Sequence, residues 1–68
     1  MAQVANLKFV DGDSGEQGLV LIRVEGNLVG LALSLLNNGD IEVFVDAHVL
    51  DEIIQALGNA REMIGPGR

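Results

Sequence analysis

The sequence is notable first for the residue types it lacks. It contains no cysteine, tryptophan or tyrosine, only two phenylalanines, and four Lys or Arg against ten Asp or Glu. Without cysteine there is no disulfide, thiolate nucleophile or zinc ribbon. With so few aromatic and basic residues there is neither a base-stacking platform nor a clustered phosphate-binding surface. The net charge of −6 therefore makes nucleic acid an unexpected partner.

Long hydrophobic runs are also missing. Arg23, Glu25 and Asn27 interrupt the most apolar stretch, which is too short to span a bilayer. The N-terminal residues show no basic-then-apolar signal pattern, and a cysteine-free chain fits a reducing compartment. These features predict a soluble, cytoplasmic protein without membrane contact.

The sequence does contain a long aliphatic segment, residues 19–45, with two short turn signals. Gly26-Asn27 suits a two-residue type II′ hairpin, whose first central residue needs a positive φ. Pairing outward from this turn sets Val24 against Val29 and Ile22 against Leu31, so that aliphatic side chains share one face. The agreement between turn and pattern favours this register, because a one-residue slip would reverse every side chain.

The second turn, Asn37-Asn38-Gly39, allows two registers. A two-residue loop at 38–39 would place two carboxylates on the aliphatic face, whereas a three-residue loop at 37–39 avoids this cost. The three-residue loop is therefore predicted, with a left-handed Gly39. It pairs Leu35 with Ile41, Leu33 with Val43, and Leu31 with Val45.

The remaining segments complete one α+β domain over residues 1–68. Strands are predicted at about 4–10, 19–25, 28–36 and 41–45, with a polar loop at 11–18. A helix over about 47–64 follows, with Asp46 as its N-cap and an apolar stripe at helical spacing. Residues 65–68 are expected to be a flexible tail. The predicted fold is a four-stranded antiparallel meander (ββββα) with one C-terminal helix packed on one face.

The second face of this sheet is expected to carry apolar side chains that no element of the chain covers. A 68-residue chain buries only about 60% of its surface, so further burial would matter. Contiguous exposed apolar groups indicate interaction surfaces, and symmetric self-association is the commonest form. We therefore expect a homo-oligomer, with a dimer favoured over a different partner or a monomer. The expected interface consists of Leu19, Leu21, Leu28, Ala32, Leu36 and Phe44.

No catalytic, cofactor-binding or metal site is expected, and the chain is predicted not to be an enzyme. Asp11, Asp13 and Glu16 lie on a Gly-rich loop but lack the EF-hand spacing and its distal Glu. His48 is the only histidine. Neither serine has a plausible His and acid partner. The Gly-rich loop also lacks the lysine of a P-loop.

Two alternative functions remain open. Carboxylates on the helix, with Asp40 and Glu42 nearby, would form a negative face for a basic protein, as in small acidic prokaryotic or phage inhibitors and antitoxins. The element order also resembles, in topology alone, the single-strand-binding coactivator domains. That resemblance implies basic and aromatic residues on the open sheet face, where this chain offers Arg23 and Phe44.

Overall fold

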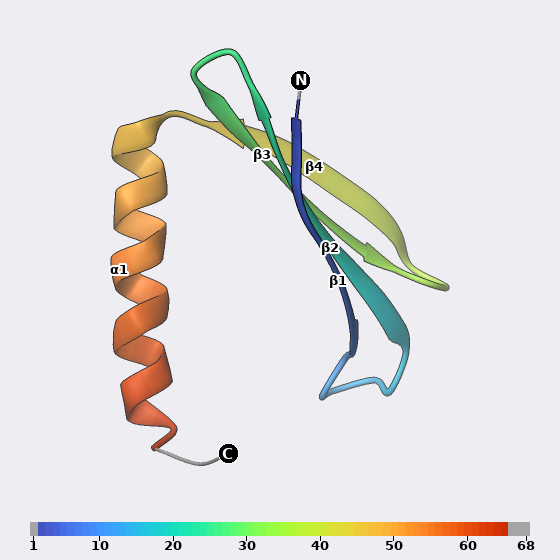
Figure 1. Cartoon of the computed structure of the whole chain (residues 1–68). Coiled ribbons are helices and arrows are strands. Elements are labelled where there is room, and N and C mark those ends of the chain that lie inside the picture. Colours follow the sequence, from blue (N-terminus) through green and yellow to red (C-terminus); the bar gives the residue numbers. More distant parts are fainter. Residues whose placement is uncertain (1, 66–68) are drawn as a thin grey trace.

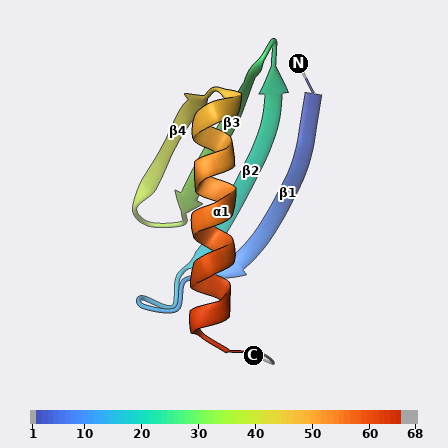
Figure 2. The same cartoon turned by 90° about the vertical axis from the view of Figure 1, so that its left-hand side faces the viewer.

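The computed structural model describes residues 2–65 and shows one antiparallel sheet followed by one helix (Figure 1). The strands are β1 (Ala2–Val10), β2 (Gln17–Glu25), β3 (Leu28–Leu35) and β4 (Gly39–Val45), in that order across the sheet. The helix α1 (Ala47–Met63) lies on one side of the sheet (Figure 2). The predicted ββββα fold is confirmed. The predicted flexible tail falls mainly on residues 66–68, outside the described residues.

β1, β2 and β4 each begin two residues earlier than predicted. β1 pairs with β2 from Ala2, opposite Val24, to Val10, opposite Gln17. The register shifts between Gln3 and Ala5, so one extra residue forms a bulge in the edge strand. Alternation alone underestimated β1 because the bulge interrupts its two-residue period.

The β2–β3 hairpin confirms the predicted register. Val24 lies opposite Val29, and Ile22 lies opposite Leu31. Gly26 has a φ of 62°, and no non-glycine residue among those described has a positive φ. A positive φ at the first central residue and not at the second is the pattern of a type II′ turn.

The β3–β4 register was predicted wrongly by two residues. Leu33 faces Ile41 and Leu31 faces Val43, so the three-residue loop is 36–38, with Gly39 at φ 77° pairing with Leu35. The Leu36 N–H donates to the Gln17 carbonyl instead of joining a β3–β4 pair. A shift of two leaves every side chain on its predicted face but changes its cross-strand neighbours.

The helix begins and ends as its sequence predicts. The Asp46 carboxylate accepts a hydrogen bond from the Val49 N–H at 3.0 Å, which caps the N-terminus. At the other end Gly65 has a φ of 79°, and its N–H donates to the Glu62 carbonyl. The Arg61 side chain donates to the Gly65 carbonyl and so stabilises the C-terminal turn. Within residues 2–65, no helix is long and apolar enough to cross a lipid bilayer.

The helix covers only part of the sheet. It comes within 8 Å (Cα to Cα) of β3 and β4 but not of β1 or β2, and the two layers diverge away from the β4–α1 link (Figure 1). Among residues 2–65 no hydrophobic residue is buried, and Gly30 is the only buried residue. The helix therefore packs on one face of the sheet, as predicted, but only over β3 and β4. The physical reason is width, because one helix of about 10 Å cannot cover four strands spaced about 4.8 Å apart.

Candidate protein-interaction surface

The helix-side face of the sheet is apolar throughout. Cross-strand pairing places on it only aliphatic residues, one phenylalanine and two glycines, and no charged or hydrogen-bonding side chain. Its members are Ala2, Ala5, Leu7, Phe9, Gly18, Val20, Ile22, Val24, Val29, Leu31, Leu33, Leu35, Gly39, Ile41, Val43 and Val45. A surface of this composition is typical of a domain interior.

Much of this face is nevertheless exposed. Leu7 on β1, Leu33 on β3 and Ile41 on β4 are 55%, 53% and 63% exposed. An open hollow of about 350 Å³ lies between the C-terminal end of β1 and the start of β4, lined in part by Phe9, Leu33 and Ile41. The uncovered part of the helix-side face is therefore an apolar surface without a second layer.

The helix carries a matching apolar seam. Leu50, Ile53, Leu57, Ala60 and Ile64 recur at alternating spacings of three and four, which places them along one side of a helix. Leu50 and Ile53 are half-buried against the sheet, whereas Leu57 and Ile64 are 65% and 70% exposed. The seam starts against the sheet and continues into open space as the two layers diverge.

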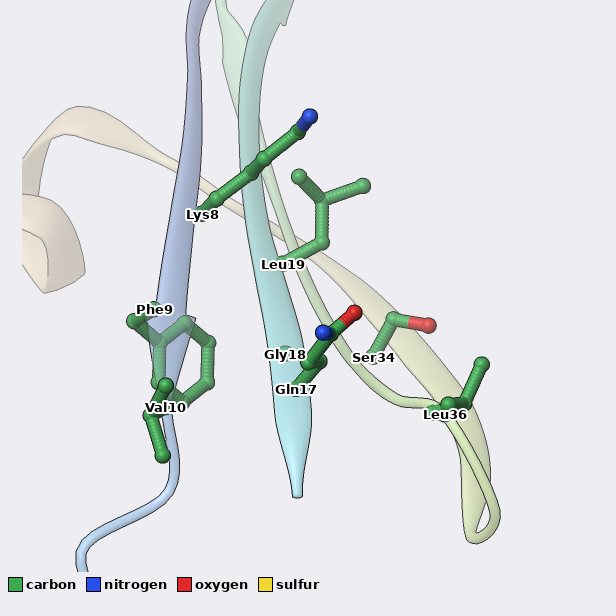
Figure 3. A pocket seen from close by; sticks show the side chains of 8 residues that line it. All are labelled: Lys8, Phe9, Val10, Gln17, Gly18, Leu19, Ser34 and Leu36. Atoms are coloured by element: carbon green, nitrogen blue, oxygen red, sulfur yellow. The ribbon is translucent and has the colours of Figure 1, made fainter. Parts of the chain in front are cut away.

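The open face, on the side away from the helix, is mixed in character. Figure 3 shows Lys8, Leu19 and Ser34 pointing away from the helix, around a shallow hollow of about 590 Å³. Polar and charged side chains from all four strands share this face with the apolar ones. They are Gln3, Asn6, Lys8, Gln17, Arg23, Glu25, Ser34, Asp40 and Glu42.

The six residues predicted as an interface all lie on the open face, but not as one group. Leu19, Leu21 and Ala32 are half-buried near its centre, while Leu28, Leu36 and Phe44 are exposed nearer its ends. The two-residue register shift puts Glu42 beside Ala32, in the place predicted for Phe44. Whether these six residues form an interface stays a prediction.

An ion pair crosses the open face, and sequence reasoning missed it. Arg23 Nη2 donates to Glu42 Oε1 at 2.7 Å, and the guanidinium lies 5.6 Å from the centroid of the Phe44 ring. Cation–π contact and the carboxylate together hold the arginine on the sheet. Arg23 and Phe44, the two residues that the resemblance offered for a single-strand-binding face, therefore contact each other.

Both aromatic rings lie over cross-strand glycines. Phe9 covers Gly18 on the helix-side face, and Phe44 covers Gly30 on the open face. Glycine within a strand allows such close approach, and the ring covers the backbone that glycine leaves bare. The sequence carried a signal for only one of these contacts: Gly30 lies within the predicted strand 28–36, whereas Gly18 falls in the predicted loop 11–18 and joins β2 only in the structure.

Gly30→Ala is expected to lower the free energy of unfolding by about 1–2 kcal/mol. A Cβ at this position would lie 2.8 Å from Phe44 Cε2 and 3.3 Å from Arg23 Cγ, so both side chains must move. Urea denaturation followed by circular dichroism measures the change. The matched control is Gly58→Ala, where nothing lies within 4 Å and better helix propensity is expected to add about 1 kcal/mol. Equal effects of the two variants would contradict this account of Gly30.

The acidic loop between β1 and β2 uses its carboxylates for internal hydrogen bonds. Ser14 Oγ donates to Asp11 Oδ2 at 2.7 Å, and this bond, with support from the Asp13 N–H, lowers the pKa of Asp11. Glu16 accepts from the Asn37 N–H and from the Asn38 side-chain amide. Among residues 2–65 no group of three or more His, Cys, Asp or Glu is placed to hold a metal ion.

The other candidate polar residues are scattered. His48 is exposed, with its Nε2 3.9 Å from a Glu52 carboxylate oxygen. Asp40 and Glu42 lie on the open face, on the opposite side of the sheet from the helix. The prediction that these two carboxylates join those of the helix in one negative face is therefore wrong.

Comparison with protein-family models, curated proteins and solved structures finds no match for this chain.

Proposed function

We propose that this chain is a small non-enzymatic interaction module that self-associates through its β-sheet, as a homodimer. The supporting observation is the lack of any buried hydrophobic residue among residues 2–65. Burial of apolar side chains is the dominant favourable contribution to folding. A chain with 49% hydrophobic residues, and with none of them buried over residues 2–65, needs another apolar surface.

The accessible area supports the same proposal. The chain exposes 5331 Å², whereas the size-scaling rule gives about 4,100 Å² for a folded monomer of 7.2 kDa. The excess is about 1,200 Å² per copy, or about 2,400 Å² for a pair, which is the range of obligate homodimers. The radius of gyration, 13.4 Å, also exceeds the roughly 11 Å of a compact chain this long.

The chemistry of the exposed surface favours an apolar partner over a charged one. The helix-side face carries no charged side chain, while the carboxylates are divided among the β1–β2 loop, the open face and the helix with its N-cap. A basic protein or a nucleic acid would find no single concentrated surface of matching charge. We place the module in the cytoplasm, where a chain without cysteine needs no disulfide for stability.

Sedimentation equilibrium tests the proposal. The expected mass is twice the chain mass of 7.2 kDa, and it is unchanged between about 0.05 and 0.5 M NaCl, because apolar association is not screened by salt. A mass of one chain at every concentration would refute self-association. A dimer that dissociates steeply with salt would refute the apolar surface and favour charged contacts instead.

A further inference from the structure

Building on this proposed self-association, we infer that the helix of each copy packs on the partner's helix-side face, over β1 and β2. In this arrangement the two helices lie side by side between two sheets. The exchange is reciprocal, so that both copies contribute the same helix surface and the same sheet surface.

The width of the sheet requires a second helix. Four strands about 4.8 Å apart form a layer some 14–19 Å wide, and neighbouring helices pack 8–10 Å apart, so two helices cover such a layer. The chain supplies one helix, which approaches β3 and β4 only. The surface over β1 and β2, including Leu7 and Val20, has space for one more.

The helix itself is apolar over too wide an arc for one contact. At 100° per residue, its apolar positions span about half of the circumference, whereas packing on a single surface needs an arc of about 100°. The apolar positions are Val49, Leu50, Ile53, Ile54, Leu57, Ala60, Met63 and Ile64. Met63 and Ile54, at the two margins of this arc, are 85% and 58% exposed. A helix between two sheets and beside a second helix would bury both margins.

A second copy fits this space better than an unrelated protein. The uncovered half-sheet and the uncovered helix margin are both apolar, and both belong to this chain. A two-fold axis buries both surfaces at once, because in an isologous interface the helix of each copy packs on the sheet of the other. The excess area of about 1,200 Å² per copy exceeds the 800 Å² or so that each partner buries in a standard interface.

Cross-linking between two labelled copies tests the arrangement directly. The chain has no cysteine, so Leu7→Cys in one copy and Leu57→Cys in a ¹⁵N-labelled copy are the only thiols after mixing in urea and refolding. Within one chain β1 and α1 do not come within 8 Å. A bis-maleimide spanning about one layer spacing of 10 Å is expected to give a mixed dimer resolved by mass spectrometry.

The matched control pairs Leu36→Cys on the open face with the same Leu57→Cys copy. This pair is expected to cross-link at least tenfold less. A protein that sediments as a dimer but gives no more mixed product from the Leu7 and Leu57 pair than from the control pair would overturn the inference. Such a result would leave self-association intact.

Two substitutions of similarly exposed leucines give a second test. Leu57→Asp is expected to raise the dimer dissociation constant about 100-fold or more, because both copies lose an apolar contact (100-fold is about 2.7 kcal/mol). Leu36→Asp, 72% exposed on the open face, is expected to change it less than threefold. A larger increase in the dissociation constant for Leu36→Asp than for Leu57→Asp would place the interface on the open face and overturn the proposed packing of each helix on the partner's sheet. A wild-type protein of single-chain mass would instead refute the proposed function itself.

Discussion

Leu33→Asp is expected to lower the free energy of unfolding by about 3–5 kcal/mol per copy, a larger loss than that expected for Gly30→Ala. In the isolated chain Leu33 is 53% exposed, so a polar side chain there would cost only about 1 kcal/mol. The size of the loss in the free energy of unfolding therefore shows whether the helix-side face is exposed to solvent or covered. Urea denaturation at a fixed protein concentration measures it.

The pH dependence of this variant separates burial from a general defect. A carboxyl introduced into a covered apolar face has its pKa raised above the unfolded value, because desolvation disfavours the charged form. The folded state then binds the extra proton, so stability is regained as pH falls and lost as pH rises through the raised pKa. Leu33→Asn, which cannot titrate, should show no such recovery beyond the wild-type profile. A loss of about 1 kcal/mol with no pH dependence would mean that this face is solvated.

Local sequence signals were sufficient where a turn and its flanking strands agree. Gly26-Asn27 fixes the pairing of Val24 with Val29 because the positive φ of the first turn residue and the aliphatic alternation give the same register. The N-cap at Asp46 was equally predictable, since its contact with the Val49 N–H spans three residues.

The β3–β4 register was not predictable from the same signals because a distant residue helps to set it. Glu16, in the β1–β2 loop, accepts hydrogen bonds from Asn37 and Asn38 and holds both in the turn. The Leu36 N–H donates to the Gln17 carbonyl, and Leu36 therefore stays out of the β3–β4 pairing. The two competing registers place the same side chains on the same faces, so hydrophobic patterning cannot choose between them.

The position of the interaction surface could not be predicted from the alternation of apolar and polar residues alone. The alternation of side chains correctly separated the two faces of the sheet. The prediction, however, took the helix-side face to be covered by the helix, and so it placed the interface on the open face. The angle between helix and sheet, and the ion pair of Arg23 with Glu42 that interrupts the open face, depend on packing in three dimensions. The exposed seam of Leu57 and Ile64 is visible only when the divergence of the two layers is known.

Diluting the wild-type protein is expected to unfold it, since no hydrophobic core remains in the separated chain among residues 2–65. For a folded dimer in equilibrium with two unfolded chains, each tenfold dilution lowers the apparent stability by about 1.4 kcal/mol. With an unfolding entropy of about 2.1 cal/mol/K per residue over two chains, the midpoint of thermal unfolding falls by about 5 °C per tenfold dilution.

Thermal unfolding followed by far-ultraviolet circular dichroism over a 100-fold concentration range would therefore show a shift of about 10 °C. The mixed dimer cross-linked through Leu7→Cys and Leu57→Cys is the control, because its unfolding becomes intramolecular and its midpoint should not move with concentration. A wild-type midpoint equally independent of concentration would show that the single chain holds its fold alone. In that case the exposed helix-side face would have to be stabilised within one copy, by closure of the helix onto β1 and β2.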